Sequence, residues 1–429
     1  MSRNQQSAAT AGLWRRAALP LGLLAAAVIL PHLFHSRFML SVLIEMCIAI
    51  TFALSYNMLL GQCGLLSFGH AVFFGLGGFF TMHALNMVND GRLPLPLEIL
   101  PLCGGLGALV AGLLFGYIST RRAGTPFALI SLGLGELIAA SALMLPSFFG
   151  GEEGVSGDRM ARITLTPFGF GQQIEVYYLV VFWMLVSIVL MKLQTQTPLG
   201  RMAGAVRDNP ERTAFVGYDT HGVRTLQFAQ AAFFAGIAGG MFALNYEIVT
   251  AEVVGQLTSA NVLMMTYIGG VGYFFGPILG AVLITLMELL LSTITHAWVL
   301  YYGLMFVALL LWAPGGLAGL IMMHEPLRRG GKLGKLLKSY VIVAGPALVL
   351  FTGFMLLIEL NYHLSLSIDP EKAMNFVGIE FHAQSTAPWA LSLSLIAVGY
   401  LLFRPTARMA RNAWRQAHRE LKETGAMNP

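Results

Sequence analysis

The chain has 429 residues, of which 56% are hydrophobic and only 11% are charged, with 48 glycines and a mean hydropathy of +0.70. This composition excludes an ordinary soluble domain and is typical of a membrane protein. The formal net charge of +5 does not indicate nucleic acid binding, because the positive-inside rule alone gives membrane proteins basic loops. Cys47, Cys63 and Cys103 have no paired spacing, so neither a disulfide framework nor a zinc site is expected.

The N-terminal sequence "LWRRAALPLGLLAAAVIL" has a charged start and an apolar middle, as a cleaved signal peptide has. No small-residue cleavage site follows it in "PHLFHSRF". An uncleaved first membrane span is therefore favoured, with a cleaved signal peptide as the alternative.

Apolar runs long enough to cross a bilayer, which takes about 20 residues, recur along the chain. Two of them, 69–88 and 258–272, are glycine-rich or short and could be broken or re-entrant. The pattern predicts an all-α, polytopic membrane protein. The twelve predicted spans are 17–34, 38–60, 69–88, 97–119, 125–145, 176–193, 226–245, 258–272, 275–293, 298–322, 340–360 and 388–404.

The basic residues predict the orientation of these spans. When the N-terminus is placed in the cytoplasm, all but five of the 26 Lys and Arg residues fall on the cytoplasmic side. This asymmetry satisfies the positive-inside rule, so both termini and the loop at 194–225 are predicted to be cytoplasmic. The five outer residues are Arg37, Arg92, Arg159, Arg162 and Lys372.

The segment 197–224 is polar and punctuated, which is unusual in so apolar a chain. Pro210 suits the first position of a helix, and Asn209 before it suits the N-cap. Glu211 lies in the first turn, where the helix dipole favours an acid, and Gly217 supplies a left-handed stop. A short helix is therefore predicted at 210–216.

So short a helix is marginal in water and persists only where it docks on another surface. Ala214, Phe215 and Val216 give it an apolar face for docking.

Motifs for enzyme chemistry are missing from the sequence. The nearest approach to a P-loop, "RRGGKLGKLL", has Arg329 in place of the first glycine and Leu336 in place of Ser or Thr. No H-E-x-x-H, G-x-S-x-G or acidic pair at catalytic spacing occurs, so we expect neither catalysis nor a cofactor. The small residues Gly75, Gly78, Ala235 and Gly239 are interpreted as helix-packing positions.

Acidic residues within the spans are few, and burying each of them in lipid is costly. Glu98 and Glu359 lie near span ends and are expected to reach water. Glu45, Glu136 and Glu288 lie deeper, where a structural hydrogen-bonding role and a polar pathway lining are both open.

Two basic stretches flank the last two spans. The run at 324–340 is interpreted as a cytoplasmic loop with possible anionic headgroup contact. In the C-terminal tail, arginines recur every three or four residues, which predicts a basic helix at the inner leaflet. These are Arg404, Arg408, Arg411, Arg415 and Arg419.

Five stretches together resemble one family, the LivM-type permease of ABC importers for branched-chain amino acids. The resemblance runs from about residue 38 to 322. The stretches are "GQCGLLSFGHAVFFGLGGFF", "GTPFALISLGLGELI", "TPLGRMAGAVRDNPERTAFVGYD", "YIGGVGYFFGPILGA" and "LLLWAPGGLAGLI".

The resemblance implies a bundle of about ten helices in a bacterial inner membrane, with cytoplasmic ATPase subunits, a sister permease and a periplasmic solute-binding protein as partners. Membrane lipids are expected partners as well, and nucleic acid is not. It also implies that the loop at 194–225 couples the spans to the ATPase. The implied coupling residues are Arg207, Asp208, Asn209, Pro210, Glu211, Arg212, Ala214, Phe215 and Gly217.

The sequence is accordingly divided into an N-terminal tail with the first span (1–37), a permease domain (38–322) and an extension with two more spans and a basic tail (323–429). The favoured function is that of a permease subunit for branched-chain amino acids or related small polar solutes. An ion-coupled secondary transporter, which would also have about twelve spans, is the alternative, and an integral membrane enzyme is a third.

Overall fold

The structure is a computed structural model that describes residues 36–160, 163–293, 297–331, 333–366, 373–376 and 378–423, together with 29, 31 and 295. Apart from residues 29 and 31, the predicted span at 17–34 lies outside this described part. The chain forms two compact units. Unit 1 comprises Met1–Leu290 with Phe306–Gly319, and unit 2 comprises Leu291–Met305 with Leu320–Pro429.

Unit 1 is a helical bundle centred on α10 (Thr220–Tyr246), which packs against α2 (Arg37–Cys63), α3 (Ala71–Asn89) and α4 (Leu100–Ser119). Short strands β1 (Val155–Ser156) and β2 (Ile248–Val249) pair antiparallel, with Val155 opposite Val249. The remaining elements are η1 (Leu97–Ile99), α5 (Thr125–Met144), α6 (Pro146–Phe149), α7 (Gln173–Gln194), α8 (Pro198–Asp208), α9 (Pro210–Phe215), η2 (Ala251–Val254), α11 (Gln256–Gly269) and α12 (Gly276–Leu286), which continues as a π-helical turn, Met287–Leu291.

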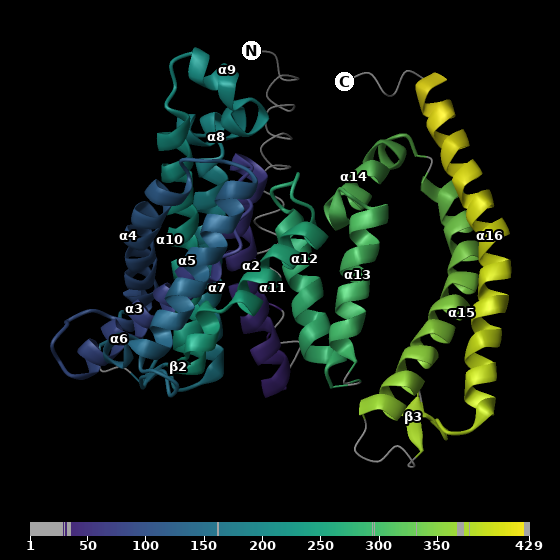
Figure 1. Cartoon of the computed structure of the whole chain (residues 1–429), viewed down its shortest axis with the longest axis horizontal. Coiled ribbons are helices and arrows are strands. Elements are labelled where there is room, and N and C mark those ends of the chain that lie inside the picture. The colour runs from purple at the N-terminus through teal and green to yellow at the C-terminus, as the bar shows by residue number, and fades with distance from the viewer. Residues whose placement is uncertain are drawn as a thin grey trace. The chain divides into compact units, whose positions relative to one another are not determined.

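The two ends of the unit 1 bundle differ. Helices α8 and α9 lie at one end, and α6 and β2 lie at the other (Figure 1). The polar loop and the strand pair are therefore separated by the length of the spans.

Glycines bring α3, α4 and α10 into backbone contact. A Cβ on Gly77 would lie 2.3 Å from the Cα of Gly236, and one on Gly104 would lie 2.4 Å from the carbonyl oxygen of Gly77. A Cβ on Gly239 would lie 1.8 Å from the carbonyl oxygen of Phe74. No larger residue fits at these positions, so the packing role predicted for Gly239 is confirmed.

Fewer full-length spans form than the twelve predicted. Among the described residues, eight helices are long and apolar enough to cross a membrane, or nine when the bent pair Trp298–Trp312 and Gly316–Arg328 counts as one. The prediction at 69–88 is confirmed by the unbroken α3.

The segment at 258–272 is too short for a full span, as its length allowed, and the predicted span at 275–293 needs correction. Helix α11 has only 14 residues, and Gly276–Leu291 is also shorter than a full span. A Cβ on Gly280 would lie 1.8 Å from the carbonyl oxygen of Met265, so the two short helices pack as a tight hairpin. Two spans cross the membrane twice, and one re-entrant pair does not cross it. The predicted side of the membrane for every other loop is therefore the same in both cases.

Unit 2 is dominated by two long helices, α15 (Leu333–Leu366) and α16 (Thr386–Glu423), which lie side by side (Figure 1). Between them β3 (Met374–Phe376) pairs with β4 (Ile379–Phe381). Helices α13 (Trp298–Trp312) and α14 (Gly316–Arg329) each contribute to both units. The predicted span at 388–404 and the basic tail form one continuous helix, α16.

Glu359 of α15, which is expected from sequence to reach water, is half-buried and makes two hydrogen bonds within the chain. Its Oε1 accepts hydrogen bonds from the Thr295 hydroxyl at 2.6 Å and from the Tyr301 hydroxyl at 2.9 Å. These bonds join residues on the two sides of the predicted domain boundary at 322. The limits of the three predicted domains stay predictions.

Candidate functional site

Helix α8 anchors the polar loop to the bundle. Thr197 caps it, since its hydroxyl accepts a hydrogen bond from the Gly200 amide at 3.2 Å. The apolar side of this otherwise polar helix buries Ala203 and Val206, and α8 contacts α10 and α2. The loop is thus held against two of the spans.

Arg207, near the end of α8, ties the loop to the last turn of α2. Its guanidinium donates a hydrogen bond to the carbonyl oxygen of Gly61, and its Nη2 lies 2.9 Å from Oδ1 of Asp208. Its aliphatic stem lies close to Gly64, where a Cβ would approach the Arg207 Cγ to 2.8 Å. Because of these contacts, a movement of the loop would displace the C-terminal end of α2 as well.

Helix α9 begins at the predicted residue and ends one residue before the predicted end. Asn209 is extended (φ −157°, ψ 94°), and its Oδ1 accepts a hydrogen bond from the Arg212 amide at 2.8 Å. Pro210 opens the helix, Glu211 lies in its first turn, and Gly217 follows in the left-handed region at φ 94°. The helix has six residues, Pro210–Phe215, one fewer than predicted.

The tip formed by α9 and the residues after it is closed by its own hydrogen bonds. Buried Thr213 donates from its hydroxyl to the Asn209 carbonyl at 2.9 Å, and its own carbonyl accepts from the Tyr218 amide at 3.3 Å. Ala214 is exposed, Phe215 is 90% exposed and Val216 is 70% exposed. The structure therefore presents a defined apolar tip that nothing in the described chain covers.

A buried glutamine, which sequence reasoning missed, links the spans at the loop end of the bundle. The Gln227 side-chain amide donates to the Met58 carbonyl at 3.0 Å and to the Gln62 side chain at 3.1 Å. Its Oε1 accepts a hydrogen bond from Gln194 at 2.7 Å. Helices α2, α7 and α10 are thereby connected where the chain enters and leaves the loop.

Two of the three predicted pathway acids lie near each other. The Tyr246 hydroxyl donates to Oε2 of Glu45 at 2.9 Å, and Glu288 lies close enough to interact electrostatically with both. Glu136 differs, since it is exposed in the middle of α5 and makes no hydrogen bond or ion pair with any residue that the structure describes. The structure therefore does not assemble the three acids into one site.

A polar cluster that was not predicted from the sequence surrounds the non-helical link between α2 and α3. His70 is fully buried, with its Nε2 3.0 Å from the Ser55 hydroxyl and its ring stacked on Phe52. The hydroxyls of Ser131 and Ser259 accept hydrogen bonds from the backbone amides of Phe68 and Ala71 at 3.0 Å each. These side chains satisfy backbone groups that no helix pairs. Serines and a histidine around a glycine break, "GLLSFGH", are the signal that could have indicated the cluster.

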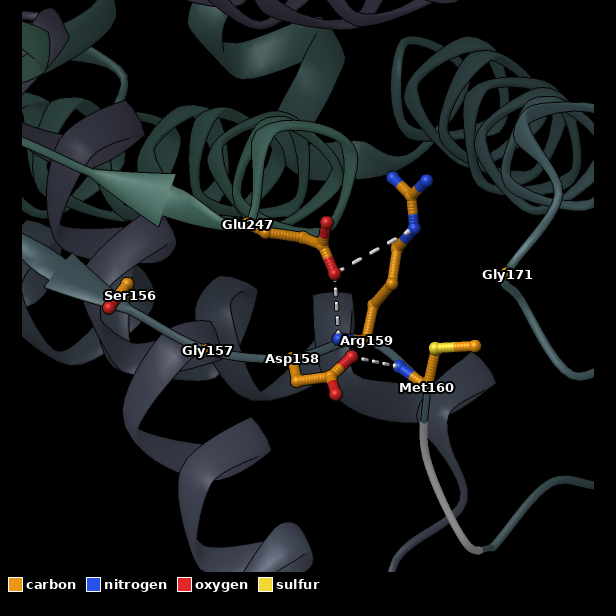
Figure 2. A pocket seen from close by; sticks show the side chains of 7 residues that line it. All are labelled: Ser156, Gly157, Asp158, Arg159, Met160, Gly171 and Glu247. Carbon is orange, nitrogen blue, oxygen red and sulfur yellow. Dashed lines mark hydrogen bonds and ion pairs between the residues drawn. The ribbon is translucent and has the colours of Figure 1, made fainter.

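A pocket of about 500 Å³ lies beside the strand pair, at the other end of the bundle from α9 (Figures 1 and 2). The Arg159 amide donates to Oε1 of Glu247 at 3.0 Å, and its guanidinium donates to the carbonyls of Phe170 and Asn245 at 3.0 and 2.9 Å. Figure 2 shows this guanidinium directed away from Asp158. The pocket is lined by Ser156, Gly157, Asp158, Arg159, Met160, Gly171 and Glu247.

Comparison with known proteins identifies the family. Residues 38–314 match the family described as the permease component of branched-chain amino acid transport systems. The chain belongs to this permease family. It is 29% identical to the high-affinity branched-chain amino acid transport system permease protein LivM of Escherichia coli (strain K12), over 67% of this chain and 72% of that protein.

Two further relatives share fewer residues with the permease. It is 23% identical to the permease protein BraD of Pseudomonas aeruginosa, over 62% of this chain and 90% of BraD. It is also 23% identical to LivH of Escherichia coli (strain K12), over the same two shares. No solved structure matches the permease significantly.

Membership of this family and the apolar helices establish a multi-pass membrane transport protein. The matched region contains the whole of the α8–α9 loop and all three predicted pathway acids. The matched region ends before α15 and α16, so the family match gives no role for these two helices.

Proposed function

We propose that this permease is the membrane subunit of an ATP-driven importer for branched-chain amino acids or related small polar solutes, and that α9 docks on a cytoplasmic ATPase subunit. The observation that carries the docking is the hydrogen-bonded tip that exposes Ala214, Phe215 and Val216. An exposed apolar surface at an aqueous end of a membrane protein is typical of a protein interface.

The other proposed partners follow from the same assembly. A sister permease is supported by the similarity of this chain to both LivM and LivH of one organism. A periplasmic solute-binding protein would approach the end of the bundle that carries the strand pair, opposite α9 (Figure 1). The location would then be the bacterial inner membrane, with both termini in the cytoplasm, as the basic residues predict.

Glu136 is proposed to face the sister permease or the pathway between the two subunits. A carboxylate in the middle of an exposed transmembrane helix requires water or a polar partner. Glu136→Gln should therefore reduce solute uptake by the assembled importer, while the isolated chain keeps its thermal stability because no described contact is lost. An unchanged uptake rate would argue against this placement.

The test of the docking proposal is Phe215→Asp, measured by ATPase co-purification and by solute uptake. Burying a phenylalanine contributes about 1.5–3 kcal/mol, so the variant should lose most bound ATPase. Membrane insertion should be unchanged, since the side chain contacts little within the chain. Arg212→Glu should have a smaller effect, because an exposed ion pair contributes only about 0–1 kcal/mol.

Leu165→Asp provides the matched control. Leu165 is also apolar and largely exposed, at 70%, but it lies in the loop between α6 and α7, on the predicted outer side. This control should retain the ATPase. Normal ATPase binding and uptake in Phe215→Asp would show that transport does not depend on docking of α9. Solute movement by the purified chain alone along an ion gradient would favour a secondary transporter.

A further inference from the structure

The basic segment of α16 is the exposed charged surface that the transport function leaves unexplained. Helix α16 has 38 residues, about 57 Å at 1.5 Å per residue, against a hydrocarbon core of about 30 Å. Five exposed arginines follow one face of its second half, and Ala413, Trp414 and Ala417 on another face pack with Leu327 and Leu336. The segment is therefore held by the fold. The arginines are Arg404, Arg408, Arg411, Arg415 and Arg419.

Contacts between α15 and α16 fix the level of these arginines. A Cβ on Gly399 would lie 2.6 Å from the Leu350 amide nitrogen, and Leu336 packs with Ala417. The helices are thus antiparallel, and interpolation places Arg404 and Arg408 beside residues 341–346 of α15. That stretch reads "VIVAGP" and is apolar throughout.

Aromatic side chains of α14, α15 and α16 meet at this end of unit 2, and we place the membrane surface at their level. The Tyr340 hydroxyl lies 2.8 Å from Nε2 of His324, whose ring lies 4.9 Å from that of Trp414. Tyrosine and tryptophan concentrate at membrane interfaces. Arg404 and Arg408 precede Trp414 by about 15 and 9 Å along the helix, so they lie on its membrane side.

No acid neutralises these two arginines within the described part of the chain. Arg404 lies over the ring of Tyr400, 5.2 Å from its centroid, and neither arginine is in an ion pair. An arginine at membrane depth on an exposed face is costly unless an anion reaches it. The positive-inside rule would explain basic residues on the aqueous side of the interface. It does not explain Arg404 and Arg408, which lie on the membrane side.

We propose that Arg404 and Arg408 bind the phosphate groups of anionic lipids in the leaflet that this end of α16 enters. Guanidinium matches phosphate geometry through paired hydrogen bonds, and the side chains of Arg404 and Arg408 are exposed on α16. Arg411, one turn farther along, can contact the same headgroup. An acidic transmembrane helix of a partner subunit is the competing occupant.

The experiment compares lipid binding by the purified full-length chain and by two double variants. Retention of phosphatidylglycerol and of phosphatidylcholine is measured by native mass spectrometry from mixed micelles. Arg404→Gln with Arg408→Gln should weaken phosphatidylglycerol binding by about 25-fold, because each cation near an anionic surface contributes about fivefold. Arg415→Gln with Arg419→Gln removes the same charge beyond the aromatic level and should weaken binding much less.

Three results would overturn the proposal. One is equal retention of the two lipids by the unaltered chain, a measurement that does not depend on any variant folding. The second is undiminished phosphatidylglycerol binding by Arg404→Gln with Arg408→Gln. The third is cross-linking of position 404 to a partner subunit in the assembled importer together with loss of the lipid. Arg404→Lys with Arg408→Lys should bind more tightly than the glutamine variant and less tightly than the unaltered chain, since the charge is preserved but the paired hydrogen bonds are lost.

Discussion

Replacing Gly239 by alanine should destabilise the permease, although alanine is ordinarily the better helix former. In the interior of a helix, Gly→Ala usually stabilises by about 1 kcal/mol. At Gly239, however, the added methyl group would lie 1.8 Å from the carbonyl oxygen of Phe74, where an ordinary contact begins at 3.4 Å. Helices α3 and α10 would have to separate by about 1.6 Å, and such overpacking costs about 1–3 kcal/mol.

Two other glycines, Gly133 and Gly78, differ from Gly239 in the space available for an added methyl group, so alanine at the three positions should change stability to different extents. A Cβ on Gly133 in α5 meets nothing within 4 Å, so Gly133→Ala should leave stability unchanged or raise it. A Cβ on Gly78 would lie 3.2 Å from a Val249 methyl group, so Gly78→Ala should fall between the two. Thermal unfolding of the three purified variants in one detergent should rank Gly133→Ala above Gly78→Ala and Gly239→Ala last. Equal Tm values, or the reverse order, would refute the assignment of Gly239 to a backbone contact.

Four further outcomes are expected. A reporter active only in the periplasm should work when fused within 149–174 and fail within 203–222, and a periplasmic signal from the second range would refute the coupling assignment. Gln227→Leu should lower the Tm because it leaves buried polar groups unpaired, at about 1–3 kcal/mol each. Glu359→Leu should destabilise more than Glu359→Gln, which keeps an acceptor for both hydroxyls, and equal Tm values would argue against those bonds. Truncation after residue 324 should leave an inserted but less stable chain, and loss of insertion would place α15 and α16 in the core.

Local signals explain why α9 could be predicted closely. Its start depends on Asn209 and Pro210, and its stop depends on Gly217, all within nine residues of sequence. Each acts through backbone geometry or a cap, which needs no distant partner. The long apolar runs of α2, α5 and α7 are equally self-contained.

Features that depend on distant partners could not be predicted. His70 looks like a residue at a span end, and only the approach of Ser55 and Phe52 shows that it is buried in a polar cluster. Glu359 likewise reads as a group near water until Thr295 and Tyr301 are brought to it. A broken or re-entrant segment at 258–272 was open from the sequence, but apolar length alone does not show that α11 folds back on α12.

The glycine contacts among α3, α4 and α10 also restrict how the permease can change shape. At these contacts the backbones of α3, α4 and α10 touch directly, with no side chains between them. Bending one of the three helices alone would therefore break its contacts with the other two. We expect these helices to move as a single rigid body during a transport cycle. Helix α5 makes far fewer contacts with α3 and α4 than these helices make with one another. Alternating exposure of the pathway would then come from α5 swinging against a fixed block, with Glu136 carried on the moving part.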